Sequence, residues 1–140
     1  MQKISSLLIV ILFIPALLSC RQSQSNQSKT NSNAKLEVLY FHVTERCPAC
    51  LSIENNTKKV LDDNFKTQMD NGIIKFTSYN IEEKTNKSLV EKYQISYLTL
   101  LIIKSDGTKT DFTNTAFQYA DTKPAKFEEL LKAEIDKNLK

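Results

Sequence analysis

The sequence contains few of the residues that bind metal ions. Among its 140 residues are three cysteines and a single histidine, His42. Only Cys47 and Cys50 lie close together, and no second Cys/His pair accompanies them. Because a closed structural zinc site takes four such ligands, this set is too small to form one. The two thiolates remain soft ligands for Cu(I) or Zn(II), with His42 as a third, so a metal-binding protein stays an alternative.

The chain also lacks a strong charge imbalance. Its formal net charge is +3 at pH 7, and removal of a leader that contains Lys3 lowers it to +2. The charges are scattered along the chain and do not form runs. We therefore predict neither nucleic-acid binding nor a strongly basic membrane-binding face.

No apolar run is long enough for a membrane-spanning helix, which needs about 20 residues. The run Leu7–Leu18, with Lys3 before it and Ser19 after it, instead has the layout of a secretory signal. The segment ending in Ser19-Cys20 resembles the lipobox of bacterial lipoproteins. This resemblance implies a signal peptide at 1–19, a diacylglycerol on Cys20, and a cell-envelope protein that faces the periplasm or the exterior. Ordinary secretion, with Cys20 incidental, is the alternative.

The next segment is almost entirely polar. Residues 21–34 are mostly Ser, Asn, Gln and Thr, with no aromatic or β-branched apolar residue. Such a segment buries too little apolar surface to offset the entropy of ordering, so we predict a disordered tether over 20–35. The remainder, 36–140, has the size of one domain.

The domain reads as alternating strands and helices. Apolar, β-rich stretches predict strands at Leu36–Val43, Ile73–Tyr79, Thr99–Ile103 and Lys109–Thr113. Helical spacing predicts a helix after the dithiol, a short one around Leu89–Tyr93, and an amphipathic C-terminal one from Pro124. Asp106-Gly107 predicts a hairpin between the last two strands. The order β-α-β-α-β-β-α indicates an α/β fold with a mixed sheet.

The most informative motif is Cys47-Pro48-Ala49-Cys50, placed where the first strand gives way to a helix. Two cysteines three apart on the first helical turn can form a disulfide with little backbone movement. The amides at the helix start also favour a thiolate on the first cysteine. Both properties suit thiol–disulfide exchange. A purely structural disulfide, half a zinc site and a chance pair are the alternatives.

Three features together resemble thioredoxin: the strand–Cys-x-x-Cys–helix unit, the run Tyr79-Asn80-Ile81-Glu82 followed by Leu89–Ile95, and Thr99–Ile102. The resemblance implies a thioredoxin-like four-stranded mixed sheet with flanking helices that lacks the usual first strand and helix. It also implies that Cys47 is the exposed nucleophile and Cys50 the buried resolving cysteine. The implied partners are protein thiol or disulfide substrates and a redox partner protein. We expect a monomer and no cofactor.

The chain departs from the thioredoxin pattern at three positions. In the substrate-docking loop formed by Tyr97, Leu98 and Thr99, Leu98 stands where the family has a cis-proline. We expect a trans Tyr97–Leu98 bond, since a non-proline cis bond costs about 2.5–4 kcal/mol. Phe41 and Ser78 stand where the family has a buried acid and its lysine partner, so that proton relay is absent.

Two residues in or next to the Cys-x-x-Cys motif are candidates for tuning the thiol chemistry. Arg46 replaces the usual aromatic residue, and a cation there would stabilise the Cys47 thiolate. An exposed Arg46 without a role is the alternative. Pro48 resembles the Cys-Pro-x-Cys motifs of glutaredoxins and oxidising periplasmic enzymes. Together they favour a reduction potential above thioredoxin's, which is about −270 mV.

The sequence thus favours a lipid-anchored, extracytoplasmic thiol–disulfide oxidoreductase that acts through Cys47 and Cys50. A copper- or zinc-binding lipoprotein and a non-catalytic thioredoxin-like interaction module are the alternatives. His42 either faces the dithiol or is packed or exposed elsewhere. Phe117 and Tyr119, in a long connection before the last helix, either contact a partner or cover one end of the sheet.

Overall fold

Four strands form one mixed sheet in the computed structural model, which describes residues 34–140. They are β1 (Leu36–His42), β2 (Ile74–Asn80), β3 (Thr99–Lys104) and β4 (Lys109–Asp111). Their order across the sheet is β2-β1-β3-β4. β2 runs parallel to β1, and the other two neighbouring pairs are antiparallel. All four predicted strands are present, and each ends within two residues of its predicted bounds.

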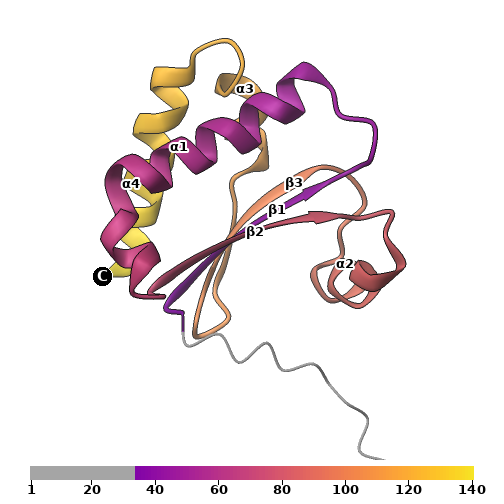
Figure 1. The fold of residues 1–140 in the computed structure, drawn as a ribbon, viewed down its shortest axis with the longest axis horizontal. Helices are drawn as coiled ribbons and strands as arrows, with labels where there is room; N and C mark the ends of the chain where they lie inside the picture. Colours follow the sequence, from indigo (N-terminus) through magenta and orange to yellow (C-terminus); the bar gives the residue numbers. More distant parts are fainter. Residues whose placement is uncertain (1–33) are drawn as a thin grey trace, which may run out of the picture. The chain divides into compact units, whose positions relative to one another are not determined.

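The helices cover both faces of this sheet. They are α1 (Pro48–Asp70), the 3-10 helix η1 (Lys84–Asn86), α2 (Lys87–Tyr93), α3 (Thr113–Tyr119) and α4 (Pro124–Leu139). In Figure 1, α1, α3 and α4 lie on one side of the strands and α2 lies on the other. The α/β class, with a four-stranded mixed sheet and flanking helices, is therefore confirmed. The sequence pattern does not predict α3, which forms in the long connection after β4.

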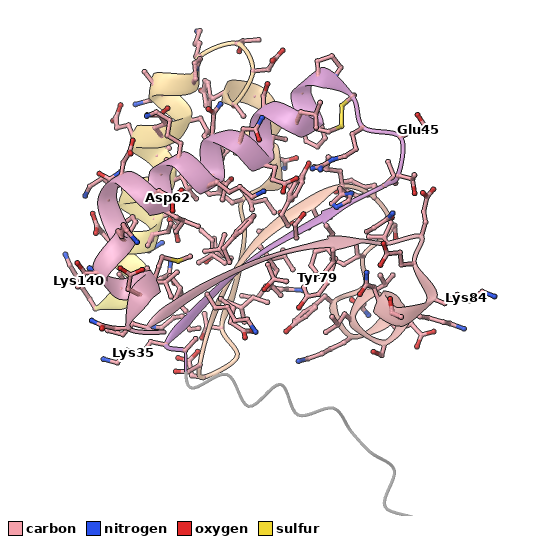
Figure 2. All side chains as sticks on the ribbon, viewed as in Figure 1. Lys35, Glu45, Asp62, Tyr79, Lys84 and Lys140 are labelled. Carbon is pink, nitrogen blue, oxygen red and sulfur yellow. A yellow bond between two sulfur atoms is a disulfide. The ribbon has the colours of Figure 1, made fainter. Side chains whose placement is uncertain are left out.

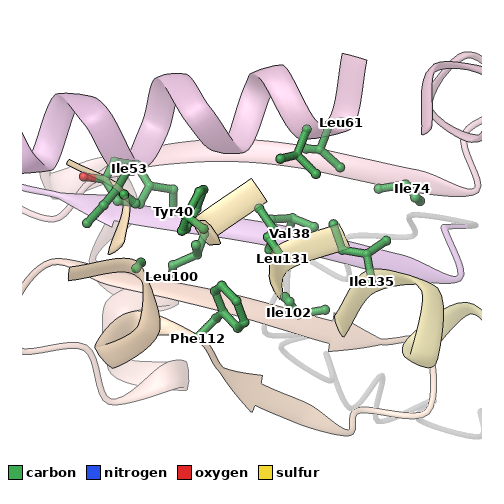
Figure 3. Close-up of a cluster of buried hydrophobic side chains, with 14 of the residues drawn as sticks. Val38, Tyr40, Ile53, Leu61, Ile74, Leu100, Ile102, Phe112, Leu131 and Ile135 are labelled. Atoms are coloured by element: carbon green, nitrogen blue, oxygen red, sulfur yellow. The ribbon is translucent and has the colours of Figure 1, made fainter. Parts of the chain in front are cut away.

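Side-chain alternation along β1 divides the core into two clusters. Val38 and Tyr40 belong to the larger cluster, on the side of α1 and α4, and Leu39 and Phe41 belong to the smaller one, beneath α2. Figure 3 shows the larger cluster, where α1 and α4 close over β1 and β3. Each large apolar side chain that is fully buried there stabilises the fold by about 1.5–3 kcal/mol.

Glycines with positive φ lie in two of the turns. Gly72, with φ of 69°, ends the connection between α1 and β2 in the left-handed region that glycine adopts without strain. Gly107, with φ of 87°, makes the turn between β3 and β4, and its N–H donates to the Lys104 carbonyl oxygen at 2.9 Å. The predicted hairpin is confirmed.

The described residues lie within one compact unit that has its own core and holds the dithiol. Its first residues already belong to the fold, since the Lys35 N–H donates to the Ile73 carbonyl oxygen at 2.9 Å. The predicted signal peptide, Cys20 and nearly all of the predicted tether lie outside the described residues. In the part of the chain that is described, no helix has the length and apolar character needed to cross a membrane.

Candidate functional site: the dithiol at the start of α1

The two cysteines of the motif form a disulfide on the first turn of α1. Figure 2 shows it as a yellow bond at the helix start, beyond the loop that carries Glu45. Cys47 has extended backbone angles and caps the helix, which begins at Pro48. Proline suits this first position, because its fixed φ matches a helix and the missing N–H would have no partner there.

The helix start directs backbone amides at Cys47. The Cys50 N–H donates to the Cys47 sulfur at 3.1 Å, and the Leu51 N–H donates to the Cys47 carbonyl oxygen at 3.1 Å. A sulfur that already accepts an amide hydrogen bond at a helix N-terminus is well placed to carry negative charge once the disulfide is reduced.

The two cysteines differ in exposure. Cys47 is exposed, whereas Cys50 is 7% exposed and belongs to the larger core cluster. The difference follows from the helical stripe of α1, because Cys50, Ile53 and Thr57 lie on its buried face. An external thiol can reach Cys47 but not Cys50. The assigned roles, attack by Cys47 and resolution by Cys50, stay predictions.

A cluster of charged and aromatic side chains lies beside the dithiol. The Tyr40 hydroxyl donates to the Cys50 carbonyl oxygen at 2.7 Å, and the Arg46 guanidinium carbon lies 5.5 Å from the centre of the Tyr40 ring. Arg46 also forms an ion pair with Glu54, which accepts a second hydrogen bond from Lys58 at 2.6 Å. The arginine is therefore not free in solvent; whether it tunes Cys47 stays a prediction.

Sequence reasoning misses Glu54, as it misses Tyr40 and Lys58. The position of Glu54 in the buried stripe of α1, four residues after Cys50, is the available signal. Burial raises the pKa of its carboxyl, but hydrogen bonds from Lys58 and Arg46 outweigh burial, so the pKa lies below its ordinary value. For Arg46, burial lowers the pKa of the guanidinium, but the contacts with Glu54 and Tyr40 outweigh burial. The pKa of Arg46 therefore lies above its ordinary value.

The predicted docking loop lies beside the carboxyl end of β1, because Thr99 pairs with Phe41 across the sheet. The described residues contain no cis peptide bond, so the Tyr97–Leu98 bond is trans, as expected. Leu98 is 6% exposed in the same core cluster as Cys50, whereas Tyr97 is 59% exposed. The Thr99 hydroxyl donates to the Tyr97 carbonyl oxygen at 2.9 Å and thus occupies an acceptor of the loop.

His42 packs within this region. Its ring stacks on Tyr40, with the ring centres 5.8 Å apart, and its Nδ1 lies 2.9 Å from the Val43 carbonyl oxygen. It therefore lies on the same face of the sheet as Tyr40. Residues 34–140 contain no group of three or more His, Cys, Asp or Glu residues that could hold a metal ion. Within these residues, His42 thus does not complete a three-ligand set with the cysteines.

Apolar side chains are exposed on the elements around the dithiol. Leu51 follows Cys50 on α1, and Phe117 lies on α3; each is 43% exposed. α3 is held to the first turns of α1 through the loop after it, where Asp121 accepts from the Ser52 hydroxyl at 2.8 Å. A separate open hollow of about 570 Å³ lies away from the dithiol. It is lined by Ala34, Met69 and residues 71–76.

Comparisons with known proteins give distant likenesses. No protein-family model and no curated protein matches the chain. A structure described as that of a malarial protein is 20% identical, with a TM-score of 0.41, over 63% of this chain and 98% of its own. A solution structure of a thioredoxin from Thermus thermophilus is 18% identical, with a TM-score of 0.44, over 74% of this chain and 76% of its own. At these TM-scores, any function has to be inferred from the geometry of the site itself.

Tyr40 gives this site a measurable pH signature. Burial raises the pKa of its hydroxyl to about 12, while the nearby Arg46 charge lowers it in part. An unfolded chain loses the same proton near pH 10, so the unfolded state binds fewer protons than the native state above that pH. Stability therefore falls as the pH rises from about 10 to about 12.

We expect the oxidised protein to lose about 2 kcal/mol of unfolding free energy through Tyr40 over this range. Tyr40→Phe costs about 1 kcal/mol at neutral pH, from the lost hydrogen bond, but removes this loss at high pH. Urea unfolding at a series of pH values measures the free energy of unfolding of the wild type and of Tyr40→Phe. Because both proteins contain the same lysines, the effects of lysine titration cancel in the difference between the two free energies. Parallel curves would contradict the assignment.

Proposed function

We propose that this chain is a thiol–disulfide oxidoreductase that exchanges disulfides with protein thiols through Cys47 and Cys50. The observation that carries the proposal is the asymmetry of the dithiol. Cys47 is exposed and its sulfur accepts a helix amide, whereas Cys50 is buried behind it in the core. An exchange catalyst needs one reachable sulfur that is stable as a thiolate, and a second sulfur within bonding distance that external thiols do not reach.

The chemistry follows from this arrangement. The Cys47 thiolate attacks one sulfur of a substrate disulfide; a bond forms between Cys47 and that sulfur, and the substrate's S–S bond breaks. The released substrate sulfur takes a proton from water. Cys50 then loses its proton and attacks the Cys47 sulfur, which releases the second substrate thiolate. The substrate gains two electrons and the protein dithiol loses two, so that the Cys47–Cys50 disulfide forms. The reverse sequence oxidises a substrate dithiol.

The surroundings of Cys47 suit a polypeptide substrate. Three large apolar side chains, Leu51, Tyr97 and Phe117, are exposed on the elements near the dithiol. The nearby cation, Arg46, is engaged with Glu54 in an ion pair. Because the Thr99 hydroxyl binds the Tyr97 carbonyl oxygen, side-chain contacts carry more of the docking here than strand pairing along the loop.

We further propose that the domain works outside the cytoplasm, held to a membrane by lipid on Cys20. The support is the signal-like pattern of residues 1–19 and the polar segment before Lys35. A bacterial host that expresses the full chain should carry it in the membrane fraction, and Cys20→Ser should release it or leave the precursor uncleaved. Membrane association that is unchanged in Cys20→Ser would contradict lipid anchoring.

Single-cysteine variants test the proposed exchange. We expect Cys50→Ser, mixed with a disulfide-bonded test protein such as insulin, to accumulate a mixed disulfide through Cys47, because the second step is removed. Cys47→Ser should accumulate at least about tenfold less, because Cys50 is buried and has no helix amide on its sulfur. Non-reducing gel electrophoresis after acid quenching measures the adduct.

The matched control for this experiment is the double variant that lacks both cysteines, which should form no adduct. Equal adduct formation by the two single variants would contradict the assignment of Cys47 as the nucleophile. A wild-type disulfide that fails to exchange with the test protein's thiols would favour the non-catalytic module instead.

A further inference from the structure

The structure buries an ionised carboxylate, Glu54, one helical turn after Cys50. Glu54 is 7% exposed, and acidic residues reach this burial almost only when they are paired. Its partners, Arg46 and Lys58, supply that pairing. A buried ion pair is nevertheless rarely more stable than apolar side chains of the same volume. The position of Glu54 therefore points to a role in the chemistry of the site.

The residues of the Arg46–Glu54 ion pair are close in the chain to both cysteines. Arg46 directly precedes Cys47 in the chain, and Glu54 lies one helical turn after Cys50, a spacing that places β-carbons about 5–6 Å apart. Tyr40 bridges the two ends, since its ring lies under the Arg46 guanidinium and its hydroxyl donates to the Cys50 carbonyl oxygen. A change in the Arg46–Glu54 pair is thus transmitted to the residues that hold the sulfurs.

Arg46 retains a donor that the ion pair does not use. Within residues 34–140, its Nε is buried and makes no hydrogen bond, and the same holds for the Ser78 hydroxyl, which lies opposite Tyr40 in the sheet register. Glu54 therefore pairs with a terminal nitrogen of the guanidinium and leaves the Nε–H of Arg46 without a partner. Arg46 is the residue directly before Cys47 in the chain. Removal of Glu54 removes the ion pair and leaves the guanidinium with its contact to the Tyr40 ring.

The charges have a direct effect on the reduced dithiol. Reduction by dithiothreitol or glutathione adds two electrons and one proton, breaks the S–S bond, and leaves a Cys47 thiolate and a Cys50 thiol. A positive group near Cys47 stabilises the thiolate, and a negative group opposes it. Glu54 opposes it twice, through its own charge and because it holds the guanidinium of Arg46. The neighbouring Tyr40 stays neutral at pH 7, since burial raises its pKa to about 12.

We propose that Glu54 is a positioning residue that holds Arg46 away from the Cys47 thiolate and so lowers the reduction potential of the dithiol. This inference rests on the proposed exchange function, since a potential matters only for a dithiol that cycles. The reduction potential of the dithiol is then set in part by a buried acid on α1, at a position where the sequence shows no catalytic motif.

Glu54→Gln tests the proposal, because glutamine keeps the shape of the side chain and removes its charge. We expect the equilibrium constant for reduction by glutathione to rise about three- to tenfold, the upper value corresponding to about 30 mV for a two-electron couple. The Cys47 pKa should fall by about 0.5–1 unit. Arg46→Gln should shift both quantities in the opposite direction. Residues 21–140 serve for all variants, since the described part has its own core.

Thiol alkylation in glutathione buffers measures the equilibrium, and the pH dependence of alkylation of the fully reduced protein measures the Cys47 pKa. Glu128→Gln is the matched control, because Glu128 pairs with Lys59 between α1 and α4, and it should change neither quantity. In an Arg46→Gln background, the effect of Glu54→Gln should shrink by at least half. Circular dichroism confirms that each variant folds.

An unchanged pKa and equilibrium constant in folded Glu54→Gln would overturn the inference, and an undiminished effect in the Arg46→Gln background would overturn the route through Arg46. If Glu54→Gln fails to fold, Arg46→Gln alone decides, and a Cys47 pKa that does not rise would contradict the proposal. A wild-type disulfide that glutathione buffers do not reduce reversibly would instead refute the exchange function. The alkylation pKa still tests the charges in that case.

Discussion

The packing of one face of α1 on β1 and β3 sets the geometry on which the site depends. Ile53, Leu61 and Phe65 are almost fully buried on this face, against Val38 and Tyr40 of the sheet. Since each buried side chain of this size contributes about 1.5–3 kcal/mol, the rotation of α1 about its axis is strongly determined. The same rotation turns Cys50 into the core and leaves Cys47 at the helix start, open to solvent.

The polar cluster depends on the same packing. The helical period that buries Ile53 also buries Glu54, which lies at the border of the apolar stripe and meets Arg46 from the loop before the helix. Tyr40 then closes the cluster from the sheet side, through its hydroxyl and its ring. The apolar contacts hold the disulfide in place, and the proposed effect on a Cys47 thiolate rests on the polar contacts beside it. The core contacts and the proposed redox site thus involve neighbouring residues of one helix.

Much of this arrangement follows from the sequence, because its signals are local. The β-rich stretch at Leu36–Val43 and the helical spacing after Cys50 predict β1 and α1, and Asp106-Gly107 predicts the hairpin between β3 and β4. The contacts of Arg46 are not predictable in this way. Its guanidinium pairs with Glu54, eight residues later, and this pairing depends on the path of the loop between β1 and α1.

Helix α3 is missed for a similar reason. It has only seven residues, too few for a helical period to show, and it is stabilised by tertiary contacts that no local pattern records. Ala116 is fully buried in the core, and the Thr113 hydroxyl accepts the Leu100 N–H at 3.0 Å. With α3 in place, Tyr119 packs partly against the larger core cluster, whereas Phe117 is exposed. Whether Phe117 contacts a partner stays a prediction.

The proposed function requires the Cys47–Cys50 disulfide to cycle between oxidised and reduced forms. The most direct measurement is a redox titration of residues 21–140 in glutathione and dithiothreitol buffers, read by thiol alkylation. An exchange catalyst should show a reversible two-electron couple between about −120 and −270 mV, the range of known exchange catalysts. A disulfide that stays closed below about −300 mV would be structural and would contradict the proposed function.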